Sequence, residues 1–367
     1  MKKVKIGIIG CGNISGIYMQ NAPTFDILDL KACADLVPER ARAQAEKYNI
    51  PNVMTVDQLL ADPEIEIVVN LTIPNAHYSV AMAALKAGKS VYNEKPLAIA
   101  SSDAREMLAL AASKGLRVGC APDTFMGAGI QTCIKLIEDG VIGKPVSATA
   151  FMLCHGHESW HPDPEFYYKV GGGPLFDMGP YYVTALVSML GAVKRVSGSA
   201  QATFPTRTIT SQPKNGTVIS VDTPTHLSAN LDFVDGATAT LITSFDVWAH
   251  HLPCIEVHGT LGSISVPDPN GFGGAVQAWT TTTRKWEDIP LVPIRAENSR
   301  CIGVADMATA IRSGRAHRAN GQMAAHVLDV FHAVIDSSKV SQYVELSSSC
   351  ERPKAMPLGL PLNLLDE

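Results

Sequence analysis

The sequence lacks the features that would direct it to a membrane or a nucleic acid. No apolar run approaches the roughly 20 residues needed to cross a bilayer. The 30 basic and 35 acidic residues leave a net charge of −5, without the basic excess that favours nucleic acids or anionic membranes. We therefore expect neither nucleic acid nor membrane as a partner.

The sequence also has no cysteine pattern that predicts a disulfide framework or a metal. The eight cysteines are scattered, with no CxxC pair and no Cys/His cluster at zinc spacing. Dispersed cysteines are typical of reduced core residues, which predicts a cytoplasmic location. His155, His157 and His161 with Asp177 match no strong ligand pattern, so no metal site is expected.

What is present fits a folded chain of two domains. The chain has 367 residues, of which 46% are hydrophobic and 18% charged. The opening MKKVKIGIIGCG resembles a short signal peptide, but its apolar run breaks at Gly-Cys-Gly after about six positions. A buried first strand is the better interpretation.

The first 120 residues alternate short apolar runs with helical patterns. Strands are expected at 4–9, 30–34, 65–71, 90–93 and 116–121, and helices from near 13 and at 38–48, 76–87 and 103–113. Continuous rather than alternating hydrophobicity indicates parallel strands buried on both faces. We predict a doubly wound Rossmann domain over residues 1–122.

The alternation of strand and helix patterns ends near residue 145. Five strand-like runs follow, at 146–153, 193–204, 223–234, 237–248 and 252–260. They predict an α/β domain over residues 123–367, built on one open, mostly antiparallel sheet. Helical stretches at 175–190, 301–313 and 322–335 complete it, and the last two could pack back on the first domain.

The turn GCGNIS directly follows the first strand and opens the first helix. In a dinucleotide-binding turn the first glycine makes the tight bend and the second lets main-chain N–H groups reach the pyrophosphate. Ser15, with Gly16 beside it, replaces the third glycine. Asp35 lies 20 residues beyond Ser15, where a carboxylate accepts hydrogen bonds from the adenosine ribose. The residues expected to hold the dinucleotide here are Gly10, Gly12, Asn13, Ile14 and Asp35.

Asp35 also favours NAD over NADP. A carboxylate there repels the additional phosphate of NADP, and Leu36 and Val37 supply no cation. Arg40 is the one nearby cation that could alter this preference.

Further segments carry a family resemblance. They are Thr72-Ile73-Pro74-Asn75 with His77, then Glu94-Lys95-Pro96, and the run GGGPLFDMGPY at 171–181. With the GCGNIS turn they resemble the Gfo/Idh/MocA family of NAD(P)-dependent sugar and cyclitol oxidoreductases. The resemblance covers nearly the whole chain, since VADMATAIRSGRAHRANGQMAAHVLDV near the C-terminus is also similar to that family.

The resemblance implies roles for Lys95 and Glu94. Removing a hydroxyl proton while hydride leaves requires a positioned base, and a nearby cation stabilises the developing alkoxide. In the family the lysine of EKP contacts the nicotinamide ribose and the reacting oxygen, which gives this role to Lys95, with Glu94 as its orienting partner. Thr72, Pro74, Asn75 and His77 are implied to line the nicotinamide side.

Asp177 and Tyr181 are four residues apart, so on a helix they share one face. The usual family pattern is D-x-x-x-H, and Tyr181 replaces the histidine, as in the branch that is similar to glucose–fructose oxidoreductase and dihydrodiol dehydrogenase. We expect Tyr181 or Lys95 to transfer the proton and Asp177 to align a substrate hydroxyl. Tyr181 would serve if the charge of Lys95 lowered its pKa.

Two further residues are assigned to the substrate. Asp123 follows the fifth strand and would suit a vicinal diol, although it could instead cap a helix from Phe125 onward. His161 lies in the aromatic and proline-rich segment 159–169, which is expected to form a pocket wall or a rigid surface loop.

These features predict an NAD-dependent oxidoreductase acting on a hydroxyl of a sugar, sugar derivative or cyclitol. One alternative is an enzyme that recycles bound NAD, as in aldose–aldose oxidoreduction or redox-assisted glycoside cleavage. The other is a non-catalytic NAD or sugar sensor of the same fold, which the presence of Lys95, Asp177 and Tyr181 disfavours. A homodimer or homotetramer through the open sheet is expected, as in the family.

Overall fold

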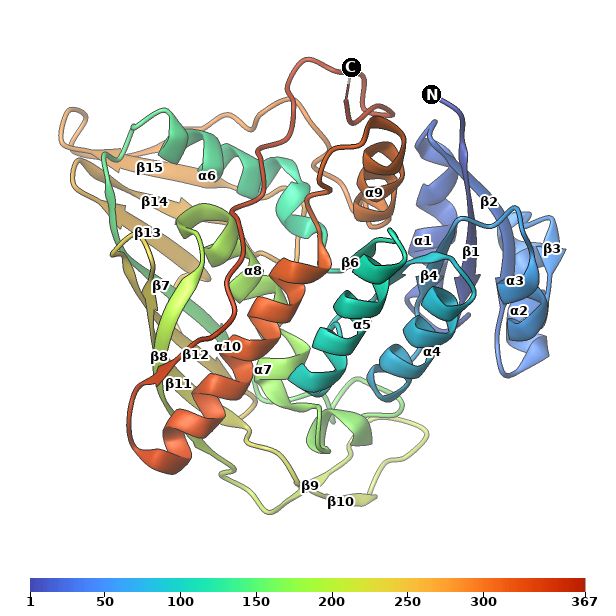
Figure 1. The fold of residues 1–367 in the computed structure, drawn as a ribbon. Coiled ribbons are helices and arrows are strands. Elements are labelled where there is room, and N and C mark those ends of the chain that lie inside the picture. The colour runs from blue at the N-terminus through green and yellow to red at the C-terminus, as the bar shows by residue number, and fades with distance from the viewer. Residues whose placement is uncertain (367) are drawn as a thin grey trace.

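A computed structural model describes residues 1–366 and shows two β-sheets with helices packed around them (Figure 1). The first sheet is parallel and has the strand order β3-β2-β1-β4-β5-β6. Its strands are β1 (Val4–Ile9), β2 (Leu28–Ala34), β3 (Asn52–Val53), β4 (Ile67–Asn70), β5 (Ser90–Asn93) and β6 (Val118–Cys120). The predicted Rossmann sheet is therefore confirmed.

Helices connect these strands and cover both faces of the sheet. They are α1 (Ser15–Asn21), α2 (Pro38–Tyr48), α3 (Val56–Ala61), α4 (Pro74–Lys86) and α5 (Ser101–Ser113), with a 3-10 turn at Ala22–Thr24. All residues of β4 and β5 are buried, which explains their continuous hydrophobic runs. The short elements β3 and α3 were not predicted from the sequence.

The second sheet has nine strands in the order β16-β15-β14-β13-β7-β12-β11-β8-β17. Only the β7–β12 pair is parallel, which confirms the mostly antiparallel sheet. Its strands are β7 (Pro145–Leu153), β8 (Val193–Gln201), β11 (His226–Phe233), β12 (Thr238–Ser244), β13 (Ile255–Gly259), β14 (Gly262–Val266), β15 (Val276–Thr280), β16 (Trp286–Ile289) and β17 (Val344–Glu345). A separate ribbon pairs β9 (Thr206–Thr208) with β10 (Val218–Ser220).

The helices of this half lie on one side of the large sheet (Figure 1). They are α6 (Ala128–Glu138), α7 (Gly173–Asp177), α8 (Gly179–Leu190), α9 (Ile302–Ser313) and α10 (Gly321–Val340), with 3-10 turns at Thr124–Met126 and Glu165–Tyr168. The helix expected over 175–190 is split at Met178, because Gly179 and Pro180 start a new helix.

The last two helices pack back on the Rossmann half. Helix α10 lies against α5 and β6 as well as β8, and α9 lies against β6. Arg312 on α9 also forms a 2.5 Å ion pair with Glu66, just before β4. The C-terminal segment thus ties the two sheets together.

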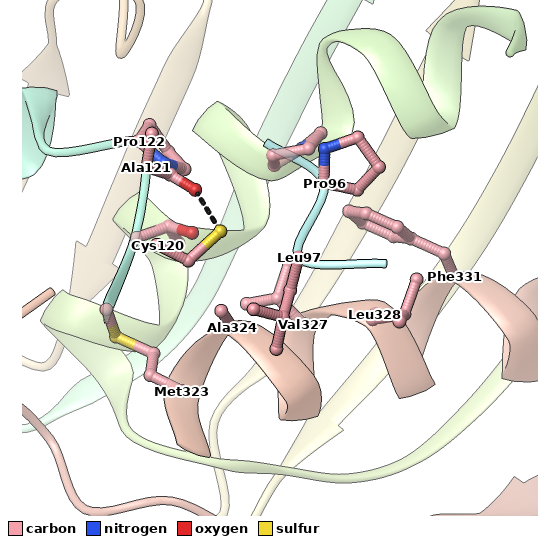
Figure 2. Close-up of a pocket in the computed structure, with 12 residues that line it drawn as sticks. Pro96, Leu97, Cys120, Ala121, Pro122, Met323, Ala324, Val327, Leu328 and Phe331 are labelled. Atoms are coloured by element: carbon pink, nitrogen blue, oxygen red, sulfur yellow. Dashed lines mark hydrogen bonds between the residues drawn. The ribbon is translucent and has the colours of Figure 1, made fainter. Parts of the chain in front are cut away.

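A small apolar cavity lies where β5 and β6 end, against α10. Figure 2 shows Pro96 and Pro122, each preceded by a cis peptide bond, beside Val327, Leu328 and Phe331 of α10. Pro180 and Thr184 of α8 complete the lining. The chain next to Lys95 and the helix that carries Tyr181 are therefore packed against the same support.

Among residues 1–366, no helix is both long enough and apolar enough to traverse a lipid bilayer.

Candidate functional site

The predicted cofactor residues follow the carboxyl ends of neighbouring parallel strands. Asp35 follows β2, the turn 10–15 follows β1, Thr72 follows β4 and Lys95 follows β5. Since the strands lie in the order β2-β1-β4-β5, these groups form a row along one sheet edge. The connections from β1 and β4 leave in opposite directions, which is where open α/β sheets bind ligands.

The turn after β1 has the geometry of a dinucleotide cradle. Gly10 has φ +100°, and a Cβ there would lie 2.6 Å from the main chain of Leu71. A Cβ on Gly12 would meet no atom within 4 Å, so the space above it is open. Gly16 takes the packing role of the third glycine, because a Cβ there would lie 2.7 Å from the Tyr48 hydroxyl. Ser15 instead donates to the Gly12 carbonyl, 2.7 Å away.

Asp35 is tied to the same turn. Its Oδ2 accepts from the Cys11 N–H at 2.7 Å and its Oδ1 accepts from the Val37 N–H at 2.8 Å. The carboxylate is therefore fixed at the end of β2, and each oxygen keeps a free lone pair for a ribose hydroxyl. The adjoining side chains of Leu36 and Val37 are exposed and uncharged.

Lys95 and Asp177 form the centre of the site. The Lys95 Nζ lies 2.7 Å from Asp177 Oδ1 and 2.6 Å from the Asp177 main-chain carbonyl. That carbonyl ends α7 and has no further helical turn to bond to, so it is a natural acceptor for a cation. Residues 82 positions apart are thereby joined across the boundary between the two sheets.

Lys95 and Asp177 each stabilise the charged form of the other. Burial acts to lower the pKa of the Lys95 ammonium, but the Asp177 carboxylate outweighs it and the pKa is raised. Burial acts to raise the pKa of Asp177, but the charge of Lys95 and the hydrogen bond from His157 lower it to about 2. Both groups are therefore charged at neutral pH, and Lys95 is a poor base in this state.

Tyr181 also lies close to Lys95, whose Nζ is 5.3 Å from the centre of the phenol ring. Its hydroxyl is 3.5 Å from Arg300 Nη2. Burial raises the pKa of Tyr181 even though Lys95 and Arg300 act to lower it. The condition of a net lowering by Lys95 is therefore not met in this state, and the phenol is neutral.

Glu94 supports Lys95 differently from the predicted arrangement. Its Oε2 accepts from the main-chain N–H of Lys95 at 3.0 Å, and its Oε1 accepts from the Tyr18 hydroxyl at 2.8 Å. Glu94 thus fixes the backbone of Lys95 to α1, while Asp177 holds the ammonium.

The residues after β4 divide into two groups. Asn75 is exposed, and Thr72 and Pro74 are half-buried at the start of α4, so all three border the edge where a nicotinamide would lie. His77 is fully buried, with Nδ1 2.7 Å from the Pro96 carbonyl and Nε2 3.1 Å from the Thr72 carbonyl. The expected cofactor contact of His77 is corrected: it fastens Thr72 and Pro96 together.

Asp123 also lies elsewhere than predicted. Its Oδ2 accepts from the main-chain N–H groups of Cys301 and Gly303, at 3.1 and 3.0 Å, and so caps the start of α9. Its other oxygen is buried without a protein partner. Burial raises the pKa of Asp123 to about 6. The carboxylate therefore caps α9 rather than the segment after Phe125, and a contact between Asp123 and a substrate diol stays a prediction.

An aromatic rim borders Asp177 on the side away from Lys95. His157 Nε2 lies 3.0 Å from Asp177 Oδ2, and its ring meets Tyr167 edge-on at 4.2 Å between centres. His161 packs edge-on against Trp160 and Tyr167, and its Nδ1 accepts from the Asp163 N–H at 3.0 Å. Trp160 is 61% exposed. Asp177 thus contacts a cluster of aromatic side chains that is partly exposed to solvent.

Two family models together cover both halves of the chain. The description "Oxidoreductase family, NAD-binding Rossmann fold" matches residues 4–121, and the "GFO/IDH/MocA C-terminal domain" matches residues 130–265. The chain belongs to the Gfo/Idh/MocA family. The predicted family, its oxidoreductase class and its NAD-binding Rossmann fold are therefore confirmed.

Individual Gfo/Idh/MocA relatives have low sequence identity to this chain and match only part of it. An inositol 2-dehydrogenase/D-chiro-inositol 3-dehydrogenase of Lactiplantibacillus plantarum is 34% identical over 39% of this chain and 42% of its own length. A myo-inositol 2-dehydrogenase of Thermotoga maritima is 27% identical over 48% of this chain and 51% of its own. The chain therefore spans about half the length of the curated relatives it matches.

Solved structures establish the fold over nearly the whole chain. An NAD-binding oxidoreductase from Klebsiella pneumoniae has a TM-score of 0.82 at 22% identity and covers 95% of this chain and 100% of that one. A levoglucosan dehydrogenase in complex with NADH and L-sorbose has a TM-score of 0.81 at 21% identity, over 94% and 99% of the two chains.

Two site residues were not assigned by sequence reasoning. His157 was considered only as a metal ligand, and it stands 14 residues before the glycine run at 171–173 that leads to Asp177. Arg300 donates from Nη2 to Asn270 Oδ1 at 2.7 Å and from Nη1 to Asn298 Oδ1 at 3.0 Å. Its position in an irregular segment before α9 carries no local signal, and only the fold brings it to Tyr181.

Proposed function

We propose that this protein is an NAD-dependent oxidoreductase that transfers hydride between nicotinamide and a secondary hydroxyl or carbonyl of a sugar, sugar derivative or cyclitol. The single observation that carries the proposal is the position of the Lys95 ammonium. It stands at the carboxyl end of β5, along the same sheet edge as the cradle at 10–15, and both Asp177 and Tyr181 lie close to it. A dinucleotide extended along that edge would present its reactive ring to this group of residues.

The dinucleotide is proposed to be held by Gly10, Gly12, Asn13 and Ile14 at the pyrophosphate and by Asp35 at the ribose. The open space above Gly12 and the exposed Asn13 fit this assignment. Bound NAD would supply the carbon that accepts or gives hydride. NAD is favoured over NADP because the fixed Asp35 carboxylate would repel a ribose phosphate.

The protein's own residues would control the reacting oxygen and its proton. The charged Lys95 and Arg300 stabilise negative charge on that oxygen and on the Tyr181 phenol. In carbonyl reduction the neutral Tyr181 gives its proton to the oxygen, and in alcohol oxidation it must first be deprotonated. Asp177 holds Lys95 and keeps acceptor capacity for a substrate hydroxyl.

The substrate class rests on the relatives and on the aromatic rim. Two of the matched relatives are named as inositol dehydrogenases, and 1,5-anhydro-D-fructose reductase of Ensifer adhaerens is 30% identical over 47% of this chain. Trp160 and His161 offer flat faces on which the C–H face of a polyol ring could stack.

The test is an activity panel of aldoses, inositols and glycosides with NAD⁺ and NADP⁺. The proposal expects NADH formation with at least one polyol and a higher kcat/KM with NAD⁺. Product formed without net NADH would indicate a recycled cofactor. Binding of NAD without turnover of any substrate would contradict a catalytic role.

We further propose a division at residue 122 into cofactor and substrate domains, a homodimer or homotetramer, and a cytoplasmic location. Val146 of β7 and Trp286 of β16 are exposed on the large sheet, and another subunit would cover them. The eight cysteines of the described chain are unpaired, in keeping with a reducing compartment.

A further inference from the structure

The His157 side chain is buried among three aromatic rings beside the candidate site. Its ring centre lies 5.1 Å from Trp160, 4.2 Å from Tyr167 and 4.7 Å from Phe245. Nε2 reaches Asp177, while Nδ1 is buried and meets no hydrogen-bond partner in the described part of the chain. The imidazole therefore makes one polar contact, and that contact is with the residue that holds Lys95.

The backbone of His157 is fixed by a buried ionic network. Its N–H donates to the Tyr168 hydroxyl at 3.3 Å, and that hydroxyl donates to Glu158. Glu158 in turn pairs with Arg207 at 2.8 Å, and Arg207 also pairs with Asp246. Because Tyr168, Glu158 and Arg207 are buried and bonded to one another, the loop holds the imidazole at one position relative to Asp177.

We propose that His157 is a positioning residue, which aligns the Asp177 carboxylate so that Oδ1 remains directed at Lys95. This inference rests on the proposed function of Lys95 and Asp177. In the neutral form Nε2–H donates to Asp177 Oδ2, and the bare Nδ1 needs no acceptor.

The test compares two variants of His157. His157→Gln keeps an N–H donor, and His157→Phe occupies the same space without a donor. We expect His157→Gln to keep kcat within about tenfold of the wild type, because its side-chain amide can still donate to Asp177. We expect His157→Phe to lower kcat about 100-fold, with unchanged NAD affinity.

Rescue by the N–H donor separates positioning from packing. Equal loss of kcat in His157→Gln and His157→Phe would overturn the proposal, because it would show that the donor to Asp177 has no effect. Equal loss of thermal stability in both His157 variants, with unchanged kcat, would also overturn it by showing a structural role only.

A readout that needs no substrate separates this inference from the proposed function. Spectra of nitrogen-labelled histidine should show His157 as the Nε2–H tautomer in the wild type and an altered signal in Asp177→Asn. If those spectra agree but no polyol is oxidised, the proposed function fails while the His157–Asp177 coupling stands. If the wild type shows the Nδ1–H tautomer, the coupling is refuted whatever the activity.

Discussion

The Lys95 ammonium and the Asp177 carboxylate, 2.7 Å apart, join the two halves of the protein at the point where a bound nicotinamide would end. One residue follows a strand of the parallel sheet and the other ends a helix that lies on the large sheet. The pairing keeps both groups charged, since each stabilises the ionised form of the other. The site is therefore assembled only in the folded two-sheet molecule.

Replacing Lys95 by methionine should abolish turnover while sparing cofactor binding. The variant removes the cation that stabilises charge on the reacting oxygen, so we expect kcat to fall about 100-fold or more. Steady-state kinetics and NADH titration measure the two effects. Lys144→Met, at an exposed position away from the site, is the matched control. Wild-type kcat in Lys95→Met would refute the assignment.

Tyr181→Phe tests which group transfers the proton. The ring that packs beside Lys95 is retained and only the hydroxyl is lost, so we expect kcat to fall about 100-fold with little change in KM. Tyr182→Phe, the buried neighbour, should keep normal kinetics. If Tyr181→Phe keeps full activity, proton transfer would pass to Lys95 or water.

Asp35→Ser should shift cofactor preference. Removing the carboxylate withdraws acceptors from the NAD ribose and a repulsive charge from the NADP phosphate, so the ratio of kcat/KM for NAD⁺ over NADP⁺ should fall by about tenfold or more. Glu39→Gln, an exposed acid of α2, serves as the control. An unchanged ratio would show that Asp35 only shapes the turn.

Much of the fold and part of the site followed from the sequence. The bounds of β1, α2 and β5 were predicted because continuous apolar runs and Pro38 mark them locally. The row of residues at strand ends also followed, since parallel strands share one edge. The roles of Asp123 and His77 did not, because their partners are set by tertiary contacts, such as that between Asp123 and Gly303, 180 positions along the chain.

Asp123→Asn should change how stability depends on pH. The folded protein raises the pKa of Asp123 from 3.8 to about 6, so it binds that proton more tightly than the unfolded chain. Stability therefore falls as pH rises from about 4 to about 6, by on the order of 2–3 kcal/mol, and the penalty remains above pH 6.

The asparagine variant cannot ionise, yet its side-chain oxygen can still accept from Cys301 and Gly303. Chemical denaturation across this range should show a flatter pH dependence than in the wild type. The exposed Asp57→Asn variant should keep the wild-type slope. A steeper slope in Asp123→Asn would show that the carboxylate is stabilised when charged.

The most direct measurement is a crystal structure of the protein grown with NADH. The account predicts the adenosine ribose at Asp35, the pyrophosphate over Gly12 and the nicotinamide ring beside the Lys95 ammonium. A nicotinamide ring directed away from Lys95, or a dinucleotide bound anywhere other than this sheet edge, would contradict it.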